Sequence, residues 1–224
     1  MTAGERNGKG QTLEEFLEEY DPYRYKNPCC TTDTVVFSYK DEQALKEGRL
    51  KILLVKRGNH PSIGGWALPG GFVNLRENLE DTARRELEEE TGVKDLPLEQ
   101  FAVYGDYDRD PRTRVITTAY LSLVNEQDIT VRAGDDAADA AWCSLCLKEK
   151  EVHTGEVSRK VWQLHVSNEE KGLDTRAEVE ETCREGLIRE RKFQVLTGGE
   201  IAVDHAAIIV QAMCILADRL LEKR

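Results

Sequence analysis

Three acidic side chains have a spacing that could bind a metal ion. Glu86, Glu89 and Glu90 stand at positions i, i+3 and i+4 of a segment with the pattern of a short helix, so they would share one side of it. Apolar residues at helical spacing predict that this side is also the buried one: Leu79, Ala83 and Leu87. Carboxylates turned toward the packed side would repel one another and be costly to desolvate unless a cation neutralises them. Oxygen ligands without a neighbouring His or Cys favour Mg²⁺ or Mn²⁺ over zinc.

The elements that must position these carboxylates are a loop that begins at Gly71 and the helix that follows it. Asn78 is expected to be the N-cap of the helix, and Gly92 has the place of a C-cap glycine. Asp81 and Glu88 fall on the opposite side, where an ordinary solvated acidic face would lie.

The stretch Gly71–Val93 resembles the signature of the Nudix hydrolases: glycine, five residues, glutamate, seven residues, then Arg-Glu-apolar-x-Glu-Glu-x-Gly-apolar. Every fixed position is filled, by Gly71, Glu77, Arg85, Glu86, Leu87, Glu89, Glu90, Gly92 and Val93. The resemblance implies that Glu86, Glu89 and Glu90 are the metal ligands, with the carbonyl of Gly71 nearby. It also implies that Glu77 and Arg85 form an ion pair that holds the loop against the helix.

Composition limits the partners and the compartment. The chain has 224 residues and a net charge of −11, which opposes nucleic acid or an anionic membrane as the main partner. It has no apolar run of membrane-spanning length and no signal-peptide core, so its six cysteines are expected to stay reduced in a cytoplasm. Cys143 and Cys146 have the spacing of a zinc or redox motif but lack a well-spaced second pair, so buried structural thiols are the favoured interpretation.

The flanking segments predict an N-terminal helix followed by a domain with several strands. A helix capped by Thr12, with Glu15 completing a capping box, is expected within residues 1–30, which form an N-terminal tail and helix. Residues 31–224 would form the domain, in which Trp66 is a core residue and residues 40–49 form a long exposed hairpin turn. Strands are expected at residues 34–39, 50–56, 98–104 and 114–124.

Three arginines could bind phosphate. Arg57 follows the second expected strand, and Arg109 and Arg112 lie in a charged turn before the last one. The two residues of this turn have two interpretations: a solvated turn, or a pair of guanidinium groups that grips a diphosphate.

Weaker motifs are similar to one branch of the Nudix family, the ADP-ribose pyrophosphatases and related repressors of NAD metabolism. They are Trp66–Val73, Arg109–Arg112, Gly134–Trp142 and Ala202–Ala206. The resemblance implies an α/β fold with a mixed sheet sandwiched between helices, and a homodimer. It further implies Mg²⁺- or Mn²⁺-dependent hydrolysis of a nucleoside diphosphate linked to another group, with ADP-ribose giving AMP and ribose 5-phosphate and Gly71, Arg57, Arg109 and Arg112 near the substrate.

Residues 147–199 match no known pattern and are expected to be an α+β insertion before a C-terminal helix at 204–223 that Asp204 caps. The insertion is predicted to hold a strand at 161–166, a helix at 174–185 and an extended return at 193–197. It could widen the sheet or form a dimer contact, or it could be a lid with a general base such as Glu178, Glu180 or Glu181.

Two other functions stay open. The repressor relatives carry a DNA-binding winged helix after the C-terminal helix, and no residues for one follow here, so DNA binding is not expected. A sensor that binds ADP-ribose or an NAD metabolite without turnover is an alternative, although an intact signature favours an enzyme. NADH, a nucleotide sugar or a dinucleoside polyphosphate could replace ADP-ribose as the substrate.

Overall fold

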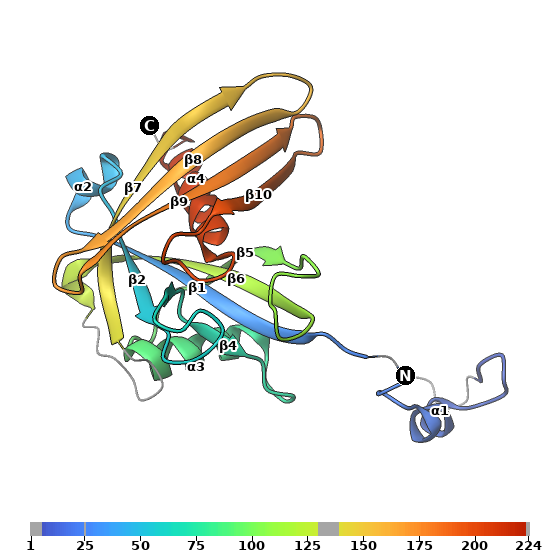
Figure 1. Ribbon diagram of the computed structural model, residues 1–224. Helices are drawn as coiled ribbons and strands as arrows, with labels where there is room; N and C mark the ends of the chain where they lie inside the picture. The colour runs from blue at the N-terminus through green and yellow to red at the C-terminus, as the bar shows by residue number, and fades with distance from the viewer. Residues whose placement is uncertain (1–5, 25, 130–138, 223–224) are drawn as a thin grey trace.

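The computed structural model describes residues 6–24, 26–129 and 139–222, which contain one mixed sheet with helices on both faces (Figure 1). The strands lie in the order β10-β9-β8-β7-β2-β1-β6-β5, with β3 beside β2 and β4 beside β1. The first five are β1 (Cys29–Tyr39), β2 (Lys51–Lys56), β3 (Trp66–Ala67), β4 (Gly70–Phe72) and β5 (Glu99–Tyr104). The others are β6 (Val115–Asn125), β7 (Asp139–His153), β8 (Ser158–Asn168), β9 (Leu173–Arg184) and β10 (Glu190–Thr197). The helices are α1 (Leu13–Glu19), α2 (Glu42–Lys46), α3 (Leu79–Thr91) and α4 (His205–Glu222), with a short 3₁₀ turn at Glu126–Asp128.

The central strand β1 is covered on both faces. It runs parallel to β6 and antiparallel to β2, and residues 31–38 are all buried. Val35 and Phe37 belong to the larger apolar core with α4, whereas Val36 packs in a second core with Leu87 of α3. Because alternate side chains of a strand point to opposite faces, α3 and α4 lie on opposite sides of the sheet. The predicted mixed sheet between helices is therefore confirmed.

The β1–β2 hairpin is present, but its connection is not simply an exposed turn. Residues 42–46 form α2, and the carboxylate of Asp41 accepts a hydrogen bond from Ala44 N at 2.8 Å. Ala44 is buried, so this short helix covers the end of the hairpin.

The N-terminal helix has the predicted capping box. Thr12 Oγ1 accepts from Glu15 N at 3.2 Å, and the Glu15 carboxylate accepts from Thr12 N at 2.7 Å. This helix buries none of its residues and stands apart from the sheet (Figure 1).

The segment 147–199 contains strands and turns only, so its predicted α+β character is wrong. The helix expected at 174–185 is the strand β9, whose side chains alternate between buried and less buried positions. Glutamates favour helices in isolation. Here the residues at every second position are buried toward α4, and only a strand places them all on that face. The strand expected at 161–166 is part of β8, and the return at 193–197 is the end of β10. The insertion therefore widens the sheet beyond β7.

The C-terminal helix begins at His205, where the backbone carbonyl of Asp204 accepts from Ala207 N at 2.9 Å. Residues 134–138 of the expected motif and residue 223 of this helix lie outside the described residues. Across the parts of the chain described above, no helix is both long enough and apolar enough to span a membrane.

Candidate functional site

The signature segment folds as a tight loop followed by α3. The helix begins after Asn78, whose extended backbone fits an N-cap, although its side chain donates to Asp81 Oδ2 at 2.7 Å instead of capping a backbone N–H. It ends at Gly92, which has a φ of 70° and donates its N–H to Glu88 O at 2.8 Å, as predicted. Ala83 and Leu87 are buried, but Leu79 is 37% exposed at the first helical position, so its predicted burial is wrong.

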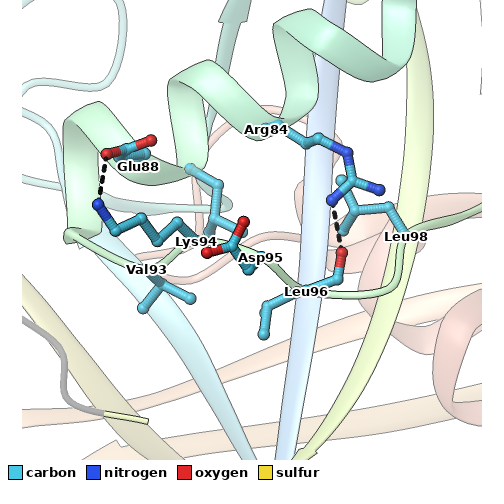
Figure 2. Close-up of a pocket in the computed structure, with 8 residues that line it drawn as sticks. Arg84, Glu88, Val93, Lys94, Asp95, Leu96 and Leu98 are labelled. Atoms are coloured by element: carbon cyan, nitrogen blue, oxygen red, sulfur yellow. Dashed lines mark hydrogen bonds and ion pairs between the residues drawn. The ribbon is translucent and has the colours of Figure 1, made fainter.

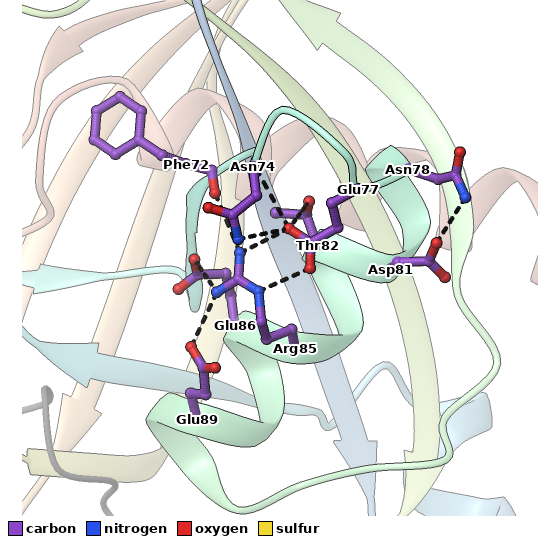
Figure 3. A network of polar contacts seen from close by, with 9 residues as sticks. All are labelled: Phe72, Asn74, Glu77, Asn78, Asp81, Thr82, Arg85, Glu86 and Glu89. Atoms are coloured by element: carbon purple, nitrogen blue, oxygen red, sulfur yellow. Dashed lines mark hydrogen bonds and ion pairs between the residues drawn. The ribbon is translucent and has the colours of Figure 1, made fainter.

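Arg85 joins the loop to the helix through a cluster of carboxylates (Figure 3). Its Nε and Nη2 donate to the two oxygens of Glu77 at 2.8 and 3.0 Å, and its Nη1 donates to Glu86 at 2.7 Å and Glu89 at 2.9 Å. Hydrogen bonds from Arg85 and Thr82 lower the pKa of Glu77 to about 2. The expected ion pair between Glu77 and Arg85 is therefore present, and it holds the loop closed over the start of α3.

Two of the predicted ligands, Glu86 and Glu90, sit directly against the glycine loop. A Cβ atom on Gly71 would lie 2.3 Å from Glu86 Cδ, so only glycine allows this carboxylate to approach the loop. Glu90 Oε2 accepts from Gly70 N at 2.9 Å. Burial raises the pKa of Glu86, and burial raises the pKa of Glu90 to about 7. In both residues burial disfavours the charged carboxylate, and for Glu86 this outweighs the nearby Arg85.

The donor set fits a hard divalent cation, although the side chains are not gathered around one. Among the described residues, no three His, Cys, Asp or Glu side chains are close enough to hold an ion as they stand. Arg85 contacts Glu86 and Glu89 instead, and the Glu89 side chain is 53% exposed. Carboxylates of Glu86, Glu89 and Glu90 and the carbonyl of Gly71 are the oxygen ligands that Mg²⁺ or Mn²⁺ would take here.

The three predicted phosphate-binding arginines have different surroundings. Arg57 Nε donates to Pro61 O at 2.7 Å, and its charge is close enough to Glu90 to oppose in part the rise in pKa that burial causes there. Arg112 lies over the ring of Phe72 at 5.2 Å and remains partly exposed. Arg109 is 6% exposed and donates two hydrogen bonds to Asp204, at 2.7 and 2.8 Å. Neither alternative described this buried position of Arg109.

Two charged or polar residues beside the site were missed by the sequence analysis. Asp33 of β1 pairs across the strands with Gly70, and its charge raises the pKa of Glu90. His205, at the start of α4, accepts a hydrogen bond from the backbone of Leu68. The only sequence signal was the motif Ala202–Ala206, which contains His205 but had no assigned role.

A separate hollow of about 160 Å³ lies at the other side of α3, near its C-terminal end (Figure 2). It is lined by residues of α3 and of the segment that follows: Arg84, Leu87, Glu88, Val93, Lys94, Asp95, Leu96 and Leu98. It includes none of the predicted ligands, and it is smaller than the several hundred Å³ typical of ligand pockets. The cysteine pair is no better candidate, because Cys143 is buried, Cys146 is exposed, and residues three apart lie on opposite faces of a strand.

Comparison with known proteins gives the family. A model of the NUDIX domain matches residues 15–160. The ADPR responsive transcriptional repressor NtrR of Acinetobacter baylyi is 42% identical over 112 residues, which are 49% of this chain and only 42% of the repressor. The ADP-ribose pyrophosphatase of Methanocaldococcus jannaschii is 43% identical over 142 residues, 63% of this chain and 76% of the relative.

The fold has a solved counterpart in a MutT/nudix family protein from Enterococcus faecalis, with a TM-score of 0.66 and 32% identity. That similarity covers 93% of this chain and 70% of the other, so it extends beyond residue 160 into the strands β8 to β10. The chain therefore belongs to the Nudix family.

Proposed function

We propose that the protein hydrolyses ADP-ribose to AMP and ribose 5-phosphate with the help of Mg²⁺ or Mn²⁺. The observation that carries this proposal is the pair of part-buried carboxylates, Glu86 and Glu90, against the glycine loop, both with raised pKa values. The substrate is suggested by the relatives, since one is an ADP-ribose pyrophosphatase and another is a repressor responsive to the same compound.

The reaction adds water to one phosphorus of the diphosphate and breaks a bond to the bridging oxygen. Bound divalent cations supply the positive charge that neutralises the diphosphate, and they acidify the attacking water. Glu86, Glu89 and Glu90 and the Gly71 carbonyl would provide the oxygens that hold these cations. Arg85 holds Glu77 and the loop in place, and Glu86 and Glu89 would have to leave its guanidinium group to bind cations.

Two arginines are exposed enough to contact the phosphate oxygens, although Arg112 also donates two hydrogen bonds to Asp110, at 2.8 and 3.0 Å. Arg57 and Arg112 are positioned beside Glu90 and Phe72, and their guanidinium groups suit a diphosphate. Arg109 was also expected in this role, but its bonds to Asp204 favour a role in holding the turn. Glu178, Glu180 and Glu181 all lie in β9, and we propose that they are sheet residues and not the general base. Glu178 binds Lys150, and Glu181 binds Arg191 and Trp162.

The compartment and the partners of the protein are proposed from its thiols, its charge and its exposed surface. A cytoplasmic location agrees with six free thiols, and a net charge of −11 opposes nucleic acid as a partner. A homodimer would provide a surface against which α1 could pack, since Leu13, Phe16 and Leu17 of this helix are exposed. The second candidate function is an ADP-ribose sensor without turnover, which the similarity to the Acinetobacter repressor favours.

The deciding experiment measures hydrolysis of a panel containing ADP-ribose, NADH, a nucleotide sugar and a dinucleoside polyphosphate, with Mg²⁺ or Mn²⁺. Glu89→Gln should lose activity by at least about a hundredfold, since it removes one charged ligand. Glu88→Gln is a matched control: both side chains are 53% exposed and ion-paired, but Glu88 binds Lys94 on the far side of the helix.

AMP release from ADP-ribose that disappears in Glu89→Gln but persists in Glu88→Gln would support the proposal. Turnover of another compound would keep the reaction and replace the substrate. Tight binding of ADP-ribose with no turnover of any compound would favour the sensor instead.

A further inference from the structure

The residues that lead into the glycine loop, Gly65–Gly71, are joined to a distant part of the chain, Glu200–His205, which we name the clamp segment. Trp66 N donates to Glu200 O at 2.8 Å, and Ala202 N donates to Trp66 O at 2.8 Å, so Trp66 and Ile201 pair in parallel. The two segments pack tightly at Gly65, where a Cβ atom would lie 3.2 Å from Glu200 O. The strands that precede the clamp segment thus return the chain to the entrance of the loop.

The last residue of the clamp segment makes a specific bond to the loop. His205 is 7% exposed, and its Nδ1 accepts a hydrogen bond from Leu68 N at 2.9 Å. An imidazole nitrogen that accepts a bond carries no proton, so the proton of His205 is on Nε2. That nitrogen faces Asp33 Oδ1 at 3.6 Å.

Three charged residues next to His205, namely Asp33, Arg109 and Asp204, hold its side chain in this orientation. Asp33 Oδ2 accepts from Thr117 Oγ1 at 2.7 Å and lies 3.6 Å from Arg109 Nη2. Arg109 in turn holds Asp204, the residue directly before His205. Asp33, Arg109, Asp204 and His205 therefore form a connected set, in which only the Asp204 side chain, at 21%, is more than 10% exposed.

The three residues after Leu68 connect it to the carboxylates of Glu86 and Glu90. Pro69 O accepts from Thr34 N at 2.8 Å, Gly70 N donates to Glu90, and Gly71 touches Glu86. A shift of Leu68 would move the two glycines relative to both predicted ligands. An unbonded Leu68 N–H would also be costly, since backbone donors in buried positions need a partner.

We propose that His205 is a positioning residue of the active site: its Nδ1 fixes Leu68, and Leu68 sets Gly70 and Gly71 against Glu90 and Glu86. This inference rests on the proposed function for its effect on turnover, but not for its effect on the loop.

Two amide variants separate the nitrogens of His205. In His205→Asn the side-chain oxygen replaces Nδ1 and can still accept from Leu68, whereas in His205→Gln the amide replaces Nε2 and leaves Leu68 without an acceptor. In the glutamine variant we expect hydrogen exchange of the Leu68 amide, followed by NMR, to accelerate about 10- to 100-fold. We expect kcat on ADP-ribose to fall by a similar factor with KM nearly unchanged, because misplaced groups affect turnover more than binding. The asparagine variant should resemble the parent in both measurements.

His165→Gln is the control, since His165 contacts Asp174 at 2.7 Å on the partly exposed surface of β8 and β9. It should leave exchange of Leu68 and kcat unchanged. If His205→Gln fails to fold, His205→Leu removes the acceptor with an apolar side chain and should show the same loss.

Equal Leu68 exchange in the Asn and Gln variants would overturn the inference whether or not the enzyme turns over. A loss of kcat in both variants that merely follows their global stability in urea would also overturn it. Absence of turnover in the parent would instead contradict the proposed function, while the exchange measurement would still decide the role of His205.

Discussion

Arg85 and Arg109 are both surrounded by acidic side chains, but in different ways. Arg85 lies at the edge of the site, its side chain is 27% exposed, and it contacts Glu77, Glu86 and Glu89. Arg109 lies beneath the loop, is 6% exposed, and contacts Asp33 and Asp204. The acids around Arg109 have a permanent partner, whereas two of those around Arg85 are predicted to leave it for a metal ion. Pairing of an arginine with acidic side chains thus supports the fold at Arg109, whereas at Arg85 it occupies carboxylates that a metal ion is expected to take over.

The largest effect expected from this difference is on stability. Arg109→Met removes the cation beside the buried Asp33 and the partly buried Asp204, and breaking a buried ion pair costs about 3–5 kcal/mol. Urea unfolding should show a loss of this size.

Arg219→Met is the matched control, because Arg219 also makes two hydrogen bonds to one carboxylate, Glu99 at 2.6 and 2.7 Å, but both side chains are about half exposed. It should cost no more than about 1 kcal/mol. Equal losses in the two variants would mean that Arg109 has no special place in the fold.

Glu90 differs from the acids around Arg85 and Arg109, because burial raises its pKa and no ion pair offsets this effect among the residues described. Its pKa rises from 4.5 to about 7 in the folded protein, so the folded state binds more protons than the unfolded state between these pH values. The contribution of Glu90 to the free energy of unfolding is then most favourable below pH 4.5, and it is lost as the pH rises through 7. In metal-free buffer the parent should lose about 3 kcal/mol over this window relative to Glu90→Gln, which does not titrate.

The measurement is a series of urea unfolding curves from pH 5 to 8 in the presence of a chelator. Glu88→Gln should follow the parent, because Glu88 is exposed beside Lys94. Parallel curves for the parent and Glu90→Gln would show that burial does not perturb this carboxylate. Added Mg²⁺ should reduce the difference, since a bound cation stabilises the charged form.

The signature region was predictable because its information is local. Glu86, Glu89 and Glu90 take one side of a helix through spacing alone, and Gly92 ends that helix through its own backbone freedom. The ion pair between Glu77 and Arg85 also followed from the family pattern and is present.

The remainder depends on contacts distant in sequence. Glu178 and Glu181 made residues 174–185 look helical, and only the pairing of β9 with β8 and β10 makes them a strand. Arg109 meets Asp204 across 95 residues, and His205 meets Leu68 across 137. No periodicity within one segment contains such pairings.

The smallest effect on stability is expected at Arg85, the other half of the comparison. Arg85→Met removes a cation that is 27% exposed and whose partners are 16% exposed for Glu77 and Glu86 but 53% exposed for Glu89, so the free energy of unfolding should fall by about 1 kcal/mol, less than in Arg109→Met. Activity should nevertheless fall strongly, since Glu77 and the loop lose their connection to α3. Urea unfolding and ADP-ribose hydrolysis on the same preparation measure both effects. A stability loss as large as that of Arg109→Met would place Arg85 among the supports of the fold, whereas unchanged turnover would show that the loop keeps its position without it.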